Sequence, residues 1–148
     1  MTAQSTATSE PKDVVLRFMK LMSTSNNDDR DQAMEMFAED ATVWIAGNLP
    51  YSGTTQGKAK IIEKIYMPAR TRMISGTKSL NIHSVITEGD LVVVEWTSRR
   101  TTVAGKDYQN DLCGIFRVQD GKIKMLREYL DTLHAKAMNW PDAEAKAS

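Results

Sequence analysis

Hydrophobic residues recur at helical spacing in three stretches of the first half of the chain. A first helix is predicted over 11–22, with Pro11 near its first turn. A second is predicted from about 27 to 38, and its first turn carries acidic residues that suit the helix dipole. The third covers 58–67 and is expected to stop at Pro68, because proline cannot continue a regular helix.

The second half of the chain is rich in the β-branched and aromatic residues that are typical of strands. The predicted strands cover 41–46, 80–87, 91–102, 108–118 and 123–132. Two tight turns, at Ala104-Gly105 and Asp120-Gly121, join the last three into an antiparallel unit. A short helical turn is expected around 133–140.

Helices gathered early and strands gathered late indicate an α+β domain. We expect a cone in which three N-terminal helices pack on a strongly curved, mostly antiparallel sheet and leave a cavity inside. This domain is assigned to residues 11–134, between a disordered tail at 1–10 and a C-terminal tail at 135–148.

The Ala104-Gly105 turn predicts which residues of its two strands share a face. With these two residues as the loop, Thr101 lies opposite Tyr108 and Arg99 opposite Asn110. The same register places further residues on this face: Leu91, Val93, Glu95, Leu112 and Phe116. An apolar face with a few convergent polar groups is typical of a small-molecule pocket.

The composition argues against several classes of function. The 148 residues include 19 basic and 19 acidic side chains, so the net charge of zero favours neither nucleic acid nor an anionic membrane as a partner. The single Cys113 excludes an intramolecular disulfide, and the histidines lack the spacing of a metal site. No apolar run is long enough to span a bilayer and no secretory pattern begins the chain, so we expect a cytoplasmic protein.

Four parts of the chain together match the pattern of a known family. They are FAEDATVWIAGNLPYSGTTQGKAKI, GDLVVVEWTS, the spaced Gly105, Tyr108 and Asn110, and DGKIKMLREYLDT. Over residues 11–133 the chain resembles the SnoaL-like family of the nuclear transport factor 2-like superfamily. The resemblance implies the cone fold but not one reaction, because the steroid Δ5-isomerases, limonene epoxide hydrolases and scytalone dehydratases are all relatives.

The chain departs from the catalytic sets that this resemblance implies. The segment 42–45 has no carboxylate where the steroid isomerases would have their base, and Gly114 stands where their oxyanion-holding Asp would fall. Arg99 and Asp131 match two members of the Asp–Arg–Asp set of the epoxide hydrolases, whereas Thr101 replaces the middle Asp.

The predicted catalytic group consists of five polar residues: Asp131, Arg99, Glu95, Tyr108 and Asn110. Asp131 is the expected base, Glu95 an acid whose pKa burial would raise, and Arg99 a donor to a carbonyl or carboxylate. Tyr108 and Asn110 could polarise a carbonyl. Each residue also has a purely structural reading, as an ion-pair or cross-strand partner. Glu128 competes with Asp131, since residues three apart on a strand face opposite sides.

Expected contacts to a small hydrophobic substrate come from nine residues: Phe18, Trp44, Tyr66, His83, Val93, Leu112, Phe116, Glu128 and Leu130. His83 could act as a proton shuttle or be merely structural. No cofactor and no metal are expected.

The outer face of the sheet is also predicted to be apolar, which favours a homodimer packed sheet to sheet. Trp96, Cys113 and Ile115 are expected in that interface. Two functions remain open. The first is a cofactor-free enzyme that uses general acid/base chemistry to isomerise, cyclise, dehydrate or hydrolyse an apolar carbonyl compound. The second is a non-catalytic cone that binds a small molecule or a protein partner.

Overall fold

The computed structural model describes residues 9–139, with side chains up to residue 136. Helices α1 (Pro11–Ser23) and α2 (Asn27–Glu35) come first, followed by strands β1 (Phe37–Ile45) and β2 (Gly53–Gln56). A helical segment then runs through α3 (Lys58–Ile61), η1 (Ile62–Tyr66) and α4 (Met67–Thr71). Strands β3 (Ser79–Glu88), β4 (Leu91–Thr101), β5 (Asp107–Gln119) and β6 (Lys122–Leu130) precede a last helix, α5 (Thr132–Asn139).

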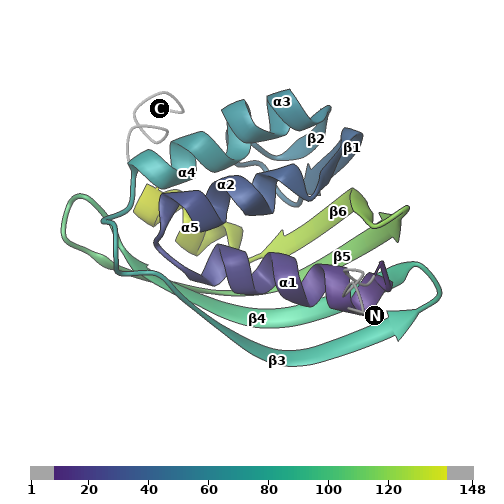
Figure 1. Ribbon diagram of the computed structural model, residues 1–148. Coiled ribbons are helices and arrows are strands. Elements are labelled where there is room, and N and C mark those ends of the chain that lie inside the picture. The colour runs from purple at the N-terminus through teal and green to yellow at the C-terminus, as the bar shows by residue number, and fades with distance from the viewer. Residues whose placement is uncertain (1–8, 140–148) are drawn as a thin grey trace.

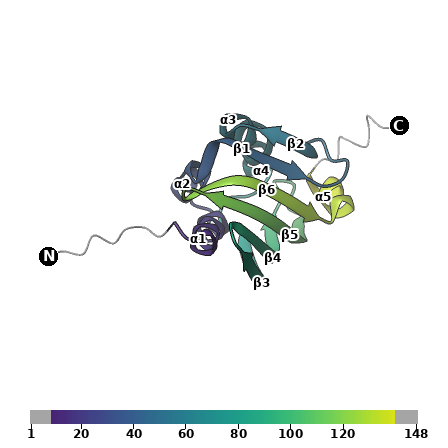
Figure 2. The same cartoon turned by 90° about the vertical axis from the view of Figure 1, so that its right-hand side faces the viewer.

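One six-stranded sheet forms the body of the molecule, in the order β2-β1-β6-β5-β4-β3. Only β1 and β6 pair in parallel, and every other neighbouring pair is antiparallel. The sheet curls around helices α1 to α4, which lie on its inner side (Figure 1). Seen from the side, α5 sits at one end of the strands and α1 and α2 at the other (Figure 2). The α+β cone predicted from the sequence is therefore confirmed.

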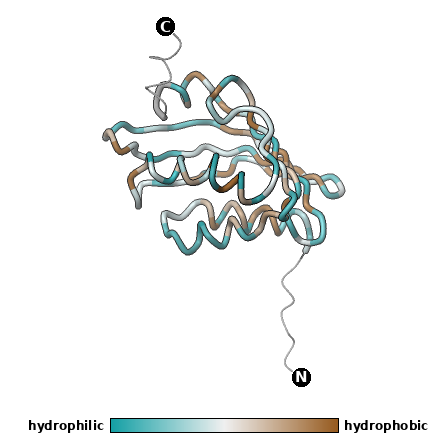
Figure 3. Tube along the Cα trace, turned by 90° about the horizontal axis from the view of Figure 1, so that it is seen from above, coloured by the Kyte–Doolittle hydropathy of each residue, from teal (hydrophilic) through white to brown (hydrophobic). Residues whose placement is uncertain are grey.

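The core lies between α1 and the inner face of the sheet. Phe18 of α1 makes edge-on contacts with Phe37 (ring centroids 5.4 Å apart) and Phe116 (5.8 Å). Both partners are essentially inaccessible to solvent, and burying an aromatic side chain stabilises the fold by about 2–3 kcal/mol. Hydrophobic and hydrophilic residues alternate along the chain trace, as expected for elements with one covered face (Figure 3).

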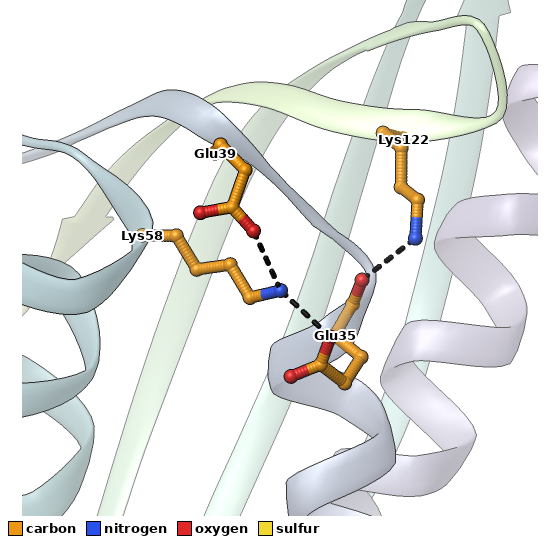
Figure 4. Close-up of polar contacts among 4 residues, drawn as sticks. All are labelled: Glu35, Glu39, Lys58 and Lys122. Carbon is orange, nitrogen blue, oxygen red and sulfur yellow. Dashed lines mark hydrogen bonds and ion pairs between the residues drawn. The ribbon is translucent and has the colours of Figure 1, made fainter.

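A lysine cluster ties the helical segment to the rest of the cone. Lys58 Nζ lies 2.8 Å from Glu35 Oε2 and 3.4 Å from Glu39 Oε1, which joins α3 to the end of α2 and to β1 (Figure 4). Lys122 Nζ donates to the backbone oxygen of Glu35 at 2.8 Å. The hydrogen bond to Glu35 raises the pKa of Lys58, so this cation stays charged in its structural role.

Several predicted boundaries differ from the structure. The helical segment does not stop at Pro68 but continues to residue 71. The wide π-helical turn η1 comes just before the proline, and its altered hydrogen-bond pattern accommodates a residue that has no N–H donor. The second helix ends at Glu35, since β1 begins at Phe37. Strand β2 was not predicted at all, and α5 crosses the predicted domain boundary at 134.

The most consequential error concerns the loop between β4 and β5. It contains three residues, 103–105, because Thr102 N donates to Lys106 O and Gly105 N donates to Thr102 O, each at 2.8 Å. Gly105 takes the left-handed conformation (φ 80°) that such a loop requires. The pairing therefore shifts by one residue, so that Arg99 opposes Gln109 and Arg100 opposes Tyr108.

This one-residue shift reverses the faces of β4 but not those of β5. On β5, Tyr108, Leu112 and Phe116 line the cavity, as predicted. On β4, Val93, Glu95 and Arg99 are cross-strand partners of the outward-facing β5 residues. The inner face of β4 instead carries Val92, Val94, Trp96, Ser98 and Arg100.

Within the part of the chain that the structure describes, no helix has the length and apolar character needed to cross a membrane. The same residues contain no group of three or more His, Cys, Asp or Glu side chains placed to hold a metal ion. Of the predicted tails at 1–10 and 135–148, residues 1–8 and 140–148 lie outside the described residues.

Candidate functional site

A cavity of about 140 Å³ lies between the helices and the inner face of the sheet. Its walls are mainly apolar, and several predicted contact residues are among them. These are Phe18, Tyr66, Leu112, Phe116, Glu128 and Leu130. Trp96, predicted for a dimer interface, also lines this cavity and is 6% exposed. The predicted apolar pocket is present, but only three of the polar residues predicted for it, Tyr66, Tyr108 and Glu128, line it.

Among the residues that the structure describes, one carboxylate lines the cavity, that of Glu128 on β6. Burial raises the pKa of this carboxyl group, and the nearby charges of Arg100 and Lys78 oppose the rise. No hydrogen bond or ion pair engages the Glu128 side chain in the described part of the chain. A carboxyl group with a raised pKa and no fixed partner is suited to taking up and releasing a proton.

Gly114 makes room beside this carboxylate. It is the residue directly opposite Glu128 on β5, so no side chain from β5 covers Glu128 there. A Cβ atom at position 114 would come within 3.0 Å of the Trp96 ring and 3.1 Å of the Phe116 ring. Glycine thus lets both rings close the wall while the space in front of Glu128 stays open.

Arg100 supplies the positive charge that acts most strongly on Glu128. It extends from β4 with its guanidinium 5.5 Å from the centre of the Tyr108 ring, and its buried Nε has no hydrogen-bond partner in the described residues. Burial lowers the pKa of Arg100, and the charge of Glu128 acts in the opposite direction. Arg100 therefore combines an intact positive charge with donors that a bound molecule can use.

Tyrosine hydroxyls complete the polar lining. Burial raises the pKa of both Tyr51 and Tyr66, with a smaller contribution from the charge of Glu128, so both phenols stay protonated over the physiological range. Tyr108 Oη accepts a hydrogen bond from Asn110 Nδ2 at 2.8 Å. These groups offer neutral polar contacts around Glu128.

Asn110 and Asp131 form a structural unit rather than part of the cavity wall. Asn110 Nδ2 donates to Asp131 O at 2.9 Å, and Asp131 N donates back to Asn110 Oδ1 at 3.0 Å. The Asp131 carboxylate accepts from His134 N at 3.0 Å and so caps the first turn of α5. The sequence left open which of Glu128 and Asp131 faces the cavity, and it is Glu128 that lines it. The hypothesis that Asp131 points inward is wrong, because β6 ends at Leu130 and Asp131 is already the cap of the next helix.

Four other predicted site residues point away from the cavity. Glu95 is exposed and accepts a hydrogen bond from Ser84, and Arg99 is exposed and donates to Gln109 Oε1 at 2.9 Å. Val93 shares their outer face because of the shifted register. His83 Nε2 lies 2.7 Å from Thr97 Oγ1, which in turn donates to Asp111 Oδ1 at 2.6 Å.

Trp44 also lies outside the cavity. Its ring is 5.2 Å from that of Tyr129, and the Arg127 guanidinium stacks on it at 4.6 Å. The expectation of an interface including Trp96 is wrong, whereas Cys113 and Ile115 do lie on the outer face and are partly accessible.

Sequence reasoning missed Arg30, Tyr51, Lys78, Ser98 and Arg100, all of which line the cavity. Arg100 and Ser98 would have followed from a three-residue loop with Gly105 at its left-handed position. Arg30 had a helical signal in α2, but no periodic pattern marks Lys78, which precedes β3 in an irregular segment.

Comparison with known proteins bears on the family and the fold. The family model described as a SnoaL-like domain matches residues 15–125. No curated protein matches the chain.

Solved structures share the fold at low sequence identity. A nuclear transport factor 2-like protein of unknown function from Burkholderia pseudomallei is 20% identical, with 88% of this chain and 97% of that one covered and a TM-score of 0.73. A protein assigned as an isomerase from Rhodopseudomonas palustris is 19% identical (90% and 94% covered, TM-score 0.70). One assigned as a SnoaL-like polyketide cyclase from Jannaschia sp. CCS1 is 17% identical (94% and 97% covered, TM-score 0.68).

Proposed function

Because the chain belongs to the SnoaL-like family, we propose that it is a small enzyme that transfers protons on an apolar, carbonyl-containing molecule held in the cone. The observation that carries the proposal is Glu128, a carboxyl group with a raised pKa that faces an apolar cavity and has no ion-pair or hydrogen-bond partner among the described residues. Similar structures assigned as an isomerase and a polyketide cyclase support this class of chemistry.

The proposed reaction step uses Glu128 as the base. Its carboxylate takes a proton from the carbon next to the substrate carbonyl, and the C–H electron pair moves to make an enolate whose oxygen carries the negative charge. The positive charge of Arg100 stabilises that oxygen in a site of low dielectric. Returning the proton to another carbon isomerises the substrate. Attack of the enolate carbon on a second carbonyl cyclises it: the new C–C bond forms as that carbonyl's π electrons move to its oxygen, and the proton held by Glu128 passes to the resulting alkoxide.

Glu128 also offers a reason why the relatives' acidic residue is missing at position 114. The resemblance to steroid isomerases would place a carboxyl group there, where this chain has Gly114. Glu128 is the direct cross-strand neighbour of Gly114, so its carboxyl group occupies nearly the same region from the adjacent strand. The carboxyl group on β6 is proposed to act as the base, whereas the Asp that the resemblance places at position 114 would hold the oxyanion, a role proposed here for Arg100.

Hydrogen exchange on a model ketone tests this proposal. 2-Tetralone is an apolar bicyclic ketone with acidic α-protons, and proton NMR in D₂O follows the loss of those protons. We expect exchange faster than in buffer, and Glu128→Gln should reduce the protein-dependent rate by about 10²–10⁴-fold, the usual contribution of a general base. Glu95→Gln, which alters an exposed carboxylate on the outer face, is the matched control and should leave the rate unchanged.

Two outcomes would contradict the proposal that this protein is an enzyme. Exchange that survives Glu128→Gln would remove Glu128 from the chemistry. Binding of 2-tetralone without any acceleration over buffer would favour the non-catalytic binding cone instead.

A homodimer through the outer face is proposed alongside this function. Trp44, Tyr129, Cys113 and Ile115 leave apolar surface on β1, β5 and β6, which a second copy of the chain would cover. Light scattering should give the mass of a dimer at micromolar concentration, and Ile115→Asp should give a monomer. A monomeric wild-type protein would refute the dimer without affecting the cavity.

A further inference from the structure

Cationic side chains outnumber acidic ones in the cavity wall. Among the described residues, Arg30, Arg70, Lys78 and Arg100 line it, against Glu128 as the one acidic residue. Arg70 is satisfied by an ion pair with Asp31 at 3.1 Å. In the part of the chain that the structure describes, no carboxylate forms an ion pair with Arg30, Lys78 or Arg100.

These three cations come from separate parts of the chain and are held in place. Arg30 belongs to α2, Arg100 to β4, and Lys78 to the segment before β3, where its backbone N donates to Ser25 Oγ at 3.4 Å. The Nε atoms of Arg30 and Arg100 are buried without a hydrogen-bond partner among the described residues. Buried donors in this condition cost free energy unless a bound molecule satisfies them.

Their charges also repel one another. Burial lowers the pKa of Lys78 well below its usual value, and Arg100 and Arg30 lower it further. Burial lowers the pKa of Arg30 as well, with the charges of Arg70 and Arg100 as additional causes. A bound anion would offset this repulsion and raise the proton affinity of Lys78, so an anion is the ligand that this part of the cavity favours.

We propose that Arg30 and Lys78, next to Arg100, form a subsite for a permanent anionic group of the substrate, such as a carboxylate or an ionised phenol. This inference rests on the proposed function and narrows it to apolar carbonyl compounds that carry one acidic group. The anion would sit on the cationic side of the cavity, and Arg100, which interacts with both Lys78 and Glu128, would lie between the anion and the reacting carbonyl.

A matched pair of probes tests the subsite directly. 2-Naphthoate and 2-naphthylmethanol share the same ring system, and only the first is an anion at neutral pH. Isothermal titration calorimetry on the full chain should show 2-naphthoate binding at least about tenfold more tightly, because each charge-assisted hydrogen bond is stronger than a neutral one. Titrations in two buffers of different ionisation enthalpy should show proton uptake, since the anion raises the proton affinity of Lys78.

Substitutions then assign the effect to residues. Lys78→Met and Arg30→Met should each remove most of the preference for 2-naphthoate, and Lys78→Met should also abolish the proton uptake. Arg99→Met, which removes an exposed outer-face arginine, should change neither. Lys78→Arg keeps the charge and should retain much of the preference.

Stability in the absence of ligand supplies a second readout. Because the pKa of Lys78 is lowered on folding, the unfolded chain binds more protons between that lowered value and the ordinary 10.5, so wild-type stability gains from rising pH in this window. Lys78→Met should remove this gain and raise the melting temperature at neutral pH. A purely structural lysine would give a lower melting temperature when replaced.

The proposal is overturned if 2-naphthoate binds no better than 2-naphthylmethanol, if it does not bind at millimolar concentration, or if the preference survives Lys78→Met and Arg30→Met. Exchange of 2-tetralone needs no anionic group, so the two proposals fail separately. Exchange without an anion preference would refute the subsite alone, and an anion preference without exchange would refute the enzyme alone.

Discussion

The inner and outer faces of the same sheet carry similar polar residues in different states. Arg99 and Arg100 are neighbours on β4, yet Arg99 is exposed and bonded to Gln109. Arg100 instead lines the cavity, and its Nε has no hydrogen-bond partner within residues 9–139. Likewise Glu95 is exposed and bonded to Ser84, whereas Glu128 faces the cavity without a partner among the described residues. What separates a candidate functional side chain from a structural one is therefore whether its polar atoms already have hydrogen-bond partners, and not the residue type.

The largest difference between the faces should appear in stability. Phe116 is fully buried on the inner face, and Phe116→Ala should lower the free energy of unfolding by about 3–5 kcal/mol. Ile86 is 64% exposed on the outer face of the edge strand β3, and Ile86→Ala should change it by about 0.5 kcal/mol or less. Urea denaturation measures both, and equal losses would mean that the two faces are not distinct in burial.

The loop that assigns residues to the two faces gives the next largest effect. Gly105 has φ 80°, and an L-residue with a Cβ atom pays about 1–2 kcal/mol for this left-handed conformation. Gly105→Ala should therefore destabilise the protein by that amount, and Gly105→Asn by less, because asparagine tolerates this region better. Equal stability of Gly105→Ala and wild type would favour a different loop, and with it the register that points Arg99 inward.

The outer-face hydrogen-bond chain should have the smallest effect. The Thr97 hydroxyl connects His83 to Asp111. Both of these side chains are exposed, so they can hydrogen-bond to water when the Thr97 hydroxyl is removed. Thr97→Val should cost about 0.5–1.5 kcal/mol in thermal unfolding and leave 2-naphthoate affinity unchanged. A loss of affinity would show that the outer face communicates with the cavity.

The sequence was sufficient for the fold because its signals are local and repeated. The turn predicted at Gln119-Asp120-Gly121 is present. Asp120 (φ 53°) and Gly121 (φ 72°) both take the left-handed conformation, and Gln119 already pairs with Lys122. Helical spacing likewise identified α1 and the helical segment from Lys58. These patterns do not depend on distant residues.

The site was harder to predict because successive residues of a strand face opposite sides of the sheet, so an error of one residue in the loop length reverses the face of every residue in the strand. A loop one residue longer than assumed left β5 in place and turned β4 over, which replaced Glu95 and Arg99 by Ser98 and Arg100. Lys78 could not be found from a pattern, since it lies in an irregular segment and reaches the cavity through tertiary packing. Asp131 was mistaken for a catalytic residue because a helix cap and a base look alike in sequence.

An NMR titration of the glutamate side-chain carboxyl carbons tests the central claim most directly, with the Glu128 signal identified by its loss in Glu128→Gln. If Glu128 is the unpaired carboxyl group of a dry cavity, its pKa should lie above the ordinary value of 4.5 for a glutamate. Titration of Glu128 at or below 4.5 would contradict the account, because it would mean that Arg100 and Lys78 hold this carboxylate in a fixed structural ion pair.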